Sequence, residues 1–336
     1  MKALICTTPR QFDYINTETP VAAEGETLLK IERIGICGTD LHAFEGTQPY
    51  FNYPRILGHE LAATIVQTKA VGFTAGDKVT IIPYMHCGNC IACNSRKNNC
   101  CVNMRVFGVH IDGGMREFVT FPDHALLKSE GLSLDELALI EPLAIGAHVV
   151  KRANIAPNEY VLVMGAGPIG IGTAQFAKIA EAHVIVVDVN DDRLQFCKDN
   201  TSIDHAINPL KQDLMEALKQ ITSNNMPTVV IDATGNLDAI NNAFQYLAHG
   251  GRYVLVGLQK GNISFSHPEF HKREATLMSS RNADILDFMQ VMGCIKQGLI
   301  KPINYITHRV SFDELTNHFE SWLDPNSKVV KAIVEF

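Results

Sequence analysis

Short apolar runs, each bounded by glycine or proline, dominate the first 125 or so residues of the chain. The runs at 27–34, 61–67 and 78–83 have the length and the flanking turn residues that are typical of β-strands. Gly72, Gly76 and Asp77 mark a turn between two of these runs. The pattern predicts a β-rich domain, built as a small barrel or sandwich with long excursions between its strands.

The hydrophobic pattern changes near residue 144, where apolar runs begin to alternate with amphipathic stretches. Strands are predicted at 160–164, 183–187, 228–232 and 251–257, with helices at 168–180 and 191–199. Strands that alternate with helices indicate a parallel sheet built from βαβ units. After residue 282 the pattern is mixed, and it predicts helices at 285–298 and 313–322 and a final strand at 328–336.

Length and composition agree with two folded domains. The chain has 336 residues, of which 46% are hydrophobic and 19% are charged, so a disordered or fibrous protein is not expected. No run of 18 apolar residues is present, which predicts no membrane span and no membrane partner. Residues 1–6 run straight into a strand-like segment without the features of a signal peptide, so we expect a cytoplasmic protein.

The charge balance argues against a nucleic-acid partner. Lys and Arg number 29 against 36 Asp and Glu, which gives a net charge of −7. Nucleic-acid binding would need a local basic patch. The cysteine-rich segment 84–105 contains only Arg96, Lys97 and Arg105 as basic groups, too few for a zinc ribbon that binds nucleic acid.

The nine cysteines are unevenly distributed, and an odd number without an export signal disfavours a disulfide framework. Cys87, Cys90, Cys93 and Cys101 have short regular gaps, and Zn²⁺ takes four thiolates at about 2.3 Å. This spacing predicts a structural zinc lobe over residues 84–103 and disfavours a set of idle buried thiols. Cys100 competes with Cys101 as the fourth ligand, but we interpret it as a bystander.

A second motif, Gly165-Ala166-Gly167-Pro168-Ile169-Gly170, has the pattern G-x-G-x-x-G. The motif follows a predicted strand and opens a predicted helix, and the next strand ends at Asp188, 18 residues past Gly170. The glycines allow a tight turn, close approach of a pyrophosphate and helix–strand packing, and the helix N-terminus stabilises phosphate charge. In this context a glycine-rich turn without a cofactor is the less favoured interpretation, and we predict a dinucleotide site.

Asp188 favours NAD over NADP, because a carboxylate accepts hydrogen bonds from ribose hydroxyls and repels a 2′-phosphate. Arg193, five residues further on, could still contact the adenosine side. We also assign Val256, Gly257 and Leu258, at the end of a later strand, to the cofactor site.

A third group consists of Cys37, the pair His59-Glu60, and Glu141. Taken singly, each has an ordinary explanation: a core thiol, a core histidine, a capping carboxylate. Together with the four-cysteine lobe and the glycine fingerprint, in this order, they resemble the zinc-dependent medium-chain dehydrogenase/reductase family over the whole chain.

The resemblance is most specific to the threonine and polyol dehydrogenase branch, through Glu141-Pro142-Leu143 and the pairing of Thr39 with His42. Other stretches are similar to L-galactonate 5-dehydrogenases and the related starvation-sensing sugar-acid dehydrogenases, namely residues 53–55, 82–84, 108–110, 232–236, 268–272 and 280–283.

The resemblance implies an α/β architecture in two domains. A GroES-like catalytic domain would comprise residues 1–143, and residues 282–336 would return to it at the end of the chain. A Rossmann domain with a doubly wound parallel sheet, residues 144–281, would be inserted between these two segments. The active site would lie in the cleft between the domains.

The resemblance also implies the chemistry, which is oxidation of a secondary alcohol with hydride transfer to NAD. A second, catalytic zinc would bind Cys37 and His59, with Glu60 as third ligand in some states and Glu141 tuning ligand exchange. Cys37 and one glutamate neutralise the ion, so a second ionised glutamate would make the site anionic; we therefore expect the two glutamates to alternate. Thr39 and His42 would relay the proton to solvent.

The substrate implied is a sugar acid such as L-galactonate, with a polyol such as sorbitol or L-threonine as alternatives. A carboxylate favours a bidentate arginine partner, so Arg281 is the first candidate and His110 a lesser one. Arg281 could equally form an interdomain ion pair or contact the cofactor. A non-enzymatic zinc- and NAD-binding regulator is the alternative of a different class. The family further implies a homodimer or homotetramer, often joined through the edges of the Rossmann sheets.

Overall fold

The computed structural model describes residues 1–49 and 51–336. The chain divides into two compact units, the first made of Met1–Pro142 with Asp284–Phe336 and the second of Leu143–Ala283. These bounds differ from those expected from the sequence by one or two residues at each junction. None of the helices in the described part of the chain has the length and apolar character that crossing a membrane requires.

The first unit is built on three sheets. The largest has the order β10-β6-β5-β3-β18-β17, with β9 also paired to β3. Its strands are β3 (Glu26–Gly35), β5 (Glu60–Gln67), β6 (Lys78–Ile81), β9 (Phe118–Pro122), β10 (Leu126–Lys128), β17 (Ile306–Ser311) and β18 (Lys331–Glu335). A smaller sheet joins β1 (Lys2–Thr8), β2 (Gln11–Asn16) and β4 (Arg55–Ile56), and a third joins β7 (Tyr84–Met85) to β8 (Arg105–Val106).

Helices fill the excursions between these strands. They are α1 (Gly38–Glu45), α2 (Ile91–Asn94), α3 (Leu134–Ala138), α10 (Ile285–Lys296) and α11 (Leu315–His318), while α4 (Ile140–Ala153) begins in the first unit and ends in the second. The short apolar runs of the sequence therefore form a β-rich domain with long connections, as predicted.

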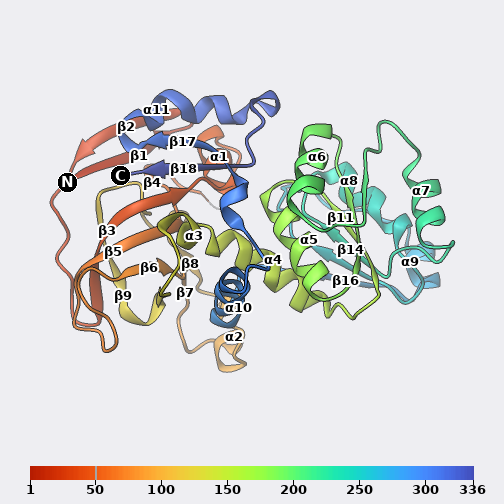
Figure 1. Cartoon of the computed structure of the whole chain (residues 1–336), viewed down its shortest axis with the longest axis horizontal. Coiled ribbons are helices and arrows are strands. Elements are labelled where there is room, and N and C mark those ends of the chain that lie inside the picture. The colour runs from red at the N-terminus through yellow and green to blue at the C-terminus, as the bar shows by residue number, and fades with distance from the viewer. Residues whose placement is uncertain (50) are drawn as a thin grey trace. The chain divides into compact units, whose positions relative to one another are not determined.

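The end of the chain completes the first unit. Strand β18 lies between β3 and β17, with Ile333 opposite Gly35 and Val334 opposite Ile34, so segments some 300 residues apart lie side by side (Figure 1). Ala332, Ile333 and Val334 are all buried, which gives this strand its place in the core.

The helix predicted at 313–322 is wrong in detail. The segment instead forms three short turns, a 3₁₀ turn at Phe312–Glu314, the four-residue α11, and a 3₁₀ turn at Phe319–Leu323. Buried residues recur at a spacing of three along this segment: Phe312 opens the first 3₁₀ turn and Leu315 follows it, and Phe319 and Trp322 both lie in the second. A spacing of three matches the three residues per turn of a 3₁₀ helix, so burial of these side chains accounts for the tighter winding.

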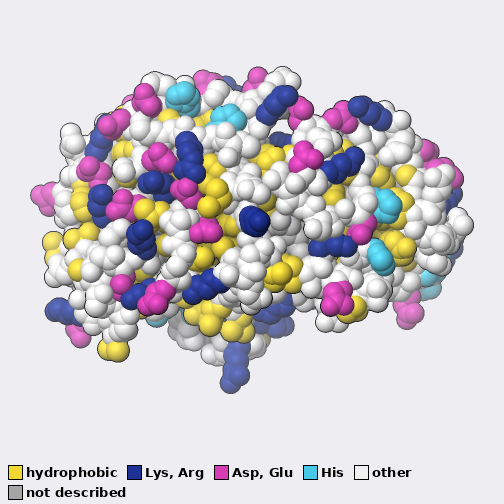
Figure 2. Space-filling model, in the orientation of Figure 1, with side chains coloured by type: hydrophobic (Ala, Val, Ile, Leu, Met, Phe, Trp, Pro, Cys, Tyr) yellow, Lys and Arg dark blue, Asp and Glu magenta, His cyan; other side chains and the backbone are white. Residues whose placement is uncertain are grey.

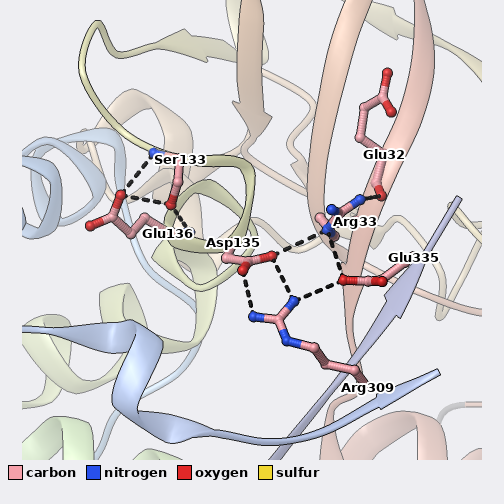
Figure 3. Close-up of polar contacts among 7 residues, drawn as sticks. All are labelled: Glu32, Arg33, Ser133, Asp135, Glu136, Arg309 and Glu335. Carbon is pink, nitrogen blue, oxygen red and sulfur yellow. Dashed lines mark hydrogen bonds and ion pairs between the residues drawn. The ribbon is translucent and has the colours of Figure 1, made fainter. Parts of the chain in front are cut away.

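An ion-pair network fastens the returning segment to the rest of the first unit (Figure 3). Asp135 on α3 accepts hydrogen bonds from Arg33 of β3 at 3.2 Å and from Arg309 of β17 at 3.2 and 2.5 Å. Arg309 also donates to Glu335 of β18 at 2.9 Å. Isolated surface ion pairs contribute little, but here one carboxylate engages two arginines from distant segments.

The second unit contains a six-stranded parallel sheet in the order β13-β12-β11-β14-β15-β16. Its strands are β11 (Tyr160–Met164), β12 (His183–Val187), β13 (His205–Ile207), β14 (Val229–Asp232), β15 (Arg252–Leu255) and β16 (Thr276–Ser279). Its helices are α5 (Pro168–Ile179), α6 (Asp191–Asn200), α7 (Leu214–Ile221), α8 (Leu237–Ala243) and α9 (His267–Lys272). This strand order is that of a doubly wound Rossmann sheet, which confirms the predicted fold class.

Acidic and basic side chains are interspersed over the face of the molecule in Figure 2, and the described residues form no broad basic patch on that face. The charges on this face thus agree with the modest net charge of the sequence.

Candidate functional site

The glycine fingerprint forms the turn between β11 and α5. Gly165 has a φ of +100°, which side-chain-bearing residues rarely adopt. A Cβ on Gly170 would lie 1.8 Å from the carbonyl oxygen of Gly165, whereas a Cβ on Gly167 would meet no atom within 4 Å. The space in front of Gly167 is therefore open, and this N-cap glycine has no side chain to cap the helix that begins at Pro168 and Ile169. Open space beside uncapped backbone N–H groups fits a pyrophosphate.

Asp188 follows β12 directly and lies beside this turn. Its carboxylate accepts hydrogen bonds from the backbone N–H of Ala166 at 2.7 Å and of Asn190 at 2.8 Å. The side chain is half-buried, and Arg193 is half-buried on the following helix, where its N–H donates to the Asn190 side chain at 3.1 Å. Backbone hydrogen bonds thus fix the Asp188 carboxylate next to the phosphate-binding turn.

The segment after β15 makes a second close contact at this edge of the sheet. The N–H groups of Val256 and Gly257 donate to the carbonyl of Asp232 at 3.0 and 3.1 Å. A Cβ on Gly257 would lie 2.1 Å from the backbone nitrogen of Gly235. Leu258 follows with 57% of its surface exposed. Gly257 is thus required for two loops to meet where parallel strands end, the usual position of a dinucleotide.

The four predicted lobe cysteines converge on one point. Cys87, Cys90, Cys93 and Cys101 form a group whose sulfur atoms lie within 4.8 Å of one another, and Cys100 is exposed outside it. Three Sγ–Sγ distances are 3.5, 3.5 and 3.9 Å. Four thiolates at about 2.3 Å from a tetrahedral Zn²⁺ would be separated by about 3.8 Å, so the group fits the ion.

Backbone N–H groups support the charged form of this lobe. Donors from Cys93 and Val102 lower the pKa of Cys90 to about 6, and a donor from Asn89 lowers the pKa of Cys87. Burial raises the pKa of Cys93 to about 11 in the absence of metal charge. Thiolates are the species that bind zinc, so the lobe is arranged to supply them.

A second donor group lies in the same unit. Ligand atoms of Cys37, His59 and Glu60 are within 4.8 Å of one another, and His59 and Glu60 are buried. Cys37 caps helix α1, whereas His59 and Glu60 are placed by the start of β5. A thiolate, an imidazole and a carboxylate form the kind of donor set that holds a catalytic zinc, with a position left for substrate.

Asp40 supports this group, although the sequence analysis did not assign it a role. It is fully buried and accepts hydrogen bonds from the N–H of Cys37 at 2.9 Å and of Gly58 at 3.1 Å. Its Oδ1 lies 3.7 Å from Nδ1 of His59, a buried atom that has no hydrogen-bond partner among the residues the structure describes. A carboxylate beside Nδ1 leaves Nε2 for a metal. Burial disfavours the charge on His59, but Asp40 and Cys37 outweigh it and raise the pKa of the imidazole well above its usual value.

Lys331 is the second residue that sequence reasoning missed. Its ammonium group on β18 is buried and donates to both carboxylate oxygens of Glu60 at 2.8 Å and to the carbonyl of Ile36 at 3.0 Å. Burial opposes the charge of Lys331, but Glu60 and Cys37 outweigh it and raise the pKa. Its signal in the sequence is a lone lysine in the apolar run 329–334, where the pattern predicts only a strand.

The lysine changes the charge argument made from the sequence. A thiolate and two carboxylates would leave a site with a divalent ion anionic, but the buried ammonium offsets one carboxylate. Charge alone therefore gives no reason for Glu60 and Glu141 to exclude each other.

Glu141 lies in the first turn of α4 and is also buried. Burial raises the pKa of this carboxyl, His59 lowers it and Glu60 raises it further. Its carboxylate accepts a short hydrogen bond from the hydroxyl of Tyr84. Glu141 lies outside the compact ligand group of Cys37, His59 and Glu60.

Helix α1 presents both residues predicted for the proton relay. Thr39 is half-buried next to Cys37, and its N–H points to the Cys37 sulfur at 3.5 Å. His42 is exposed, with Nδ1 3.2 Å from the hydroxyl of Thr47 and 3.5 Å from the carboxylate of Glu45. The residue proposed for the solvent end of the relay is therefore the exposed one.

The two substrate candidates lie in different units. Arg281 is exposed just after β16 in the second unit. His110 is half-buried in the first unit, and its Nδ1 accepts a hydrogen bond from the N–H of Val106 at 2.9 Å.

Comparison with known proteins gives matches along the whole chain. Residues 23–131 match the model of the alcohol dehydrogenase GroES-like domain, and residues 168–297 match that of zinc-binding dehydrogenases. The chain is 41% identical to L-galactonate-5-dehydrogenase of Escherichia coli K12, over 100% of this chain and 99% of that protein. It is 29% identical to a sorbitol dehydrogenase of Bacillus subtilis, over 99% of this chain and 97% of that protein. An alcohol dehydrogenase (rspB) of E. coli CFT073, solved with NADH, superposes with a TM-score of 0.92 at 31% identity over 100% and 99% of the two chains.

Proposed function

Because this chain belongs to the zinc-binding alcohol dehydrogenases with a GroES-like domain, we propose that it oxidises a secondary alcohol of a sugar acid, such as L-galactonate, with NAD as hydride acceptor. Membership of the family makes the protein an oxidoreductase of small molecules that carry alcohol groups, with zinc and a nicotinamide dinucleotide as cofactors. The proposal of a sugar acid as substrate rests on the 41% identity, over the full length, to an L-galactonate dehydrogenase.

The catalytic metal would be held by Cys37, His59 and Glu60. When bound, zinc supplies a Lewis acid that lowers the pKa of the substrate hydroxyl. Asp40 orients the imidazole of His59 and favours the Nε2 position for the metal. Lys331 holds Glu60 through both carboxylate oxygens, so it sets how much of the negative charge of that carboxylate reaches the site.

Thr39 and His42 would carry the proton away. Both lie on α1 three positions apart, and the exposure of His42 suits exchange with solvent.

Asp188 would bind the adenosine ribose, with the cofactor's pyrophosphate at the N-terminus of α5. A carboxylate that already receives two backbone N–H groups is kept in place to accept ribose hydroxyls, and its charge favours NAD over NADP. Arg193, Val256, Gly257 and Leu258 would complete the cofactor contacts. For the substrate carboxylate, Arg281 is the first candidate and His110 the second.

The decisive experiment follows NADH absorbance with purified protein, zinc and a panel of alcohols. L-galactonate should be turned over with a kcat/KM at least tenfold above those for sorbitol and L-threonine, and with NAD preferred to NADP. No turnover of L-galactonate together with efficient turnover of sorbitol would transfer the assignment to a polyol dehydrogenase, the second candidate that the sorbitol dehydrogenase relative supports. A Cys37→Ala variant with unchanged activity would refute the assigned metal site.

Two further proposals concern the setting of the enzyme. We propose a homodimer or homotetramer joined through β16, because this strand lies at the edge of the sheet, beside β15, with Leu277 exposed. Light scattering on the purified protein tests this, and a monomer would exclude it. A cytoplasmic location fits the nine cysteines, all of which lie in the described residues and outside any disulfide.

A further inference from the structure

Tyr84 is a buried polar residue that the proposed mechanism does not use. It lies on β7, where its backbone pairs with Val106 of β8, and only 7% of its surface is exposed. Its ring packs edge-on against Phe288 of α10, with the centroids 6.2 Å apart. The backbone and the ring are thus both fixed, and the hydroxyl is presented to the carboxylate of Glu141.

Glu141 has no other hydrogen-bond donor for its carboxylate among residues 1–49 and 51–336. Glu60, by contrast, is bound through both oxygens by a cation. A buried carboxylate with one neutral donor is held in place more weakly than a buried carboxylate paired with an ammonium group, because a hydrogen bond is stronger when both partners are charged. Of the two glutamates, Glu141 is therefore the one whose position a single hydroxyl can decide.

We propose that Tyr84 is a positioning residue, whose hydroxyl holds the Glu141 carboxylate outside the metal-ligand group of Cys37, His59 and Glu60 and so keeps Glu141 from occupying the position that substrate requires. This inference rests on the proposed function, since it assumes zinc at that group. Glu141 lies outside the ligand group in the structure, and the Tyr84 hydroxyl is the contact that keeps it there. The glutamate and the substrate then compete for one position, and Tyr84 biases the competition toward substrate.

Tyr84→Phe is the direct test, because it removes the hydroxyl and keeps the ring that packs on Phe288. A hydrogen bond to a charged group corresponds to about a tenfold change in an equilibrium, so the ratio of ligated to unligated Glu141 should rise by about that factor. Zinc should then be lost to a chelator more slowly, by up to about tenfold, because the loss rate follows the fraction of protein in which Glu141 is unligated. With Co²⁺ in place of the catalytic zinc, the visible absorption should weaken as the coordination number rises. KM for the alcohol should rise more than kcat falls, with NAD affinity unchanged.

Two controls separate positioning from a general loss of structure. Tyr53→Phe removes another partly buried hydroxyl of the same unit, which donates to the carbonyl of Ala43, and it should leave metal loss and the cobalt spectrum unchanged. Tyr84→Phe combined with Glu141→Gln should return both readouts to the wild-type values. Glu141→Gln alone should change metal loss little, which keeps the proposal testable even if Tyr84→Phe folds poorly.

An unaltered cobalt spectrum and rate of zinc loss in a folded Tyr84→Phe protein would overturn the inference. Faster zinc loss would overturn it as well, because Tyr84 would then be placing Glu141 on the metal. If instead the wild-type protein holds no metal at Cys37 and His59, the proposed function fails first. If the wild-type enzyme binds zinc and oxidises its alcohol, and Tyr84→Phe changes neither the cobalt spectrum nor the rate of zinc loss, only the inference about Tyr84 fails and the proposed function stands.

Discussion

Replacing Lys331 by methionine tests the charge balance of the metal site most directly. The ammonium group and the Glu60 carboxylate are 3% and 0% exposed, so neither is hydrated. Lys331→Met keeps the aliphatic stem of the side chain and leaves Glu60 as an uncompensated buried charge. Removing one partner of a buried ion pair costs about 3–5 kcal/mol, and we expect the zinc-free protein to lose this amount in free energy of unfolding.

Zinc should reduce that loss, because Glu60 in the metal-loaded protein has a second cation nearby. The free energy of unfolding can be followed in urea through Trp322, the single tryptophan, which is buried in the first unit. Lys331→Met combined with Glu60→Gln should recover most of the stability, since neither charge remains. A matched control is Lys30→Met on β3, whose half-exposed ammonium lies 3.4 Å from Glu32 and should matter little.

Two outcomes would contradict the assignment of Lys331 and Glu60 as a buried ion pair that stabilises the protein. One is a cost below about 1 kcal/mol for Lys331→Met without zinc, which would place the pair among exposed ion pairs. The other is a double variant no more stable than Lys331→Met, which would show that lost packing and not the stranded carboxylate causes the effect.

Three other predictions concern separate parts of the molecule. Cys101→Ser should lower the zinc content from two ions to one per chain in metal analysis, whereas Cys100→Ser should leave it at two, because Cys100 lies outside the sulfur group. Gly167→Ala should leave urea unfolding unchanged but weaken NAD binding more than tenfold by calorimetry, since a Cβ there meets only open space; Gly170→Ala should destabilise the second unit, because its Cβ would lie 1.8 Å from a backbone oxygen. Burial raises the pKa of Asp135, but two arginines outweigh burial and lower it, so its stabilisation is present above the ordinary pKa of about 4 and is lost as pH falls through the lower folded value. Asp135→Asn should therefore cost about 1 kcal/mol at pH 7, after allowance for partial exposure, and flatten the acid limb of stability against pH.

Strong periodicity made the centre of the Rossmann sheet predictable. Strand β11, helix α5 and strand β12 lie within a residue of the predicted bounds, because strands buried on both faces have continuous apolar runs. Strands β13 and β16 were not predicted. The first has three residues, and the second is a sheet edge with three of its four residues exposed, so neither carries a pattern that burial imposes.

In the candidate site, contacts between residues close in the sequence could be predicted, and contacts between distant residues could not. Ligand spacing and the glycine fingerprint are local, and the structure brings together the cysteines, the imidazole and Glu60 as expected. Lys331 meets Glu60 across 271 positions, and Tyr84 meets Glu141 across 57. Such contacts are set by the fold: the lone lysine in the apolar run 329–334 marks Lys331 as unusual, but one sequence does not identify the distant carboxylate that it meets.

The returning strand β18 therefore has two separable contributions to the first unit. Its backbone pairs with β3 on one side and β17 on the other, and its lysine neutralises Glu60. Deleting residues 328–336 would remove both contributions, whereas Lys331→Met removes only the charge. If deletion lowers stability well beyond the 3–5 kcal/mol assigned to the stranded carboxylate, the excess measures the strand pairing. If the two changes cost the same, the strand is held in place chiefly by the ion pair, and the metal site and the sheet depend on one buried contact.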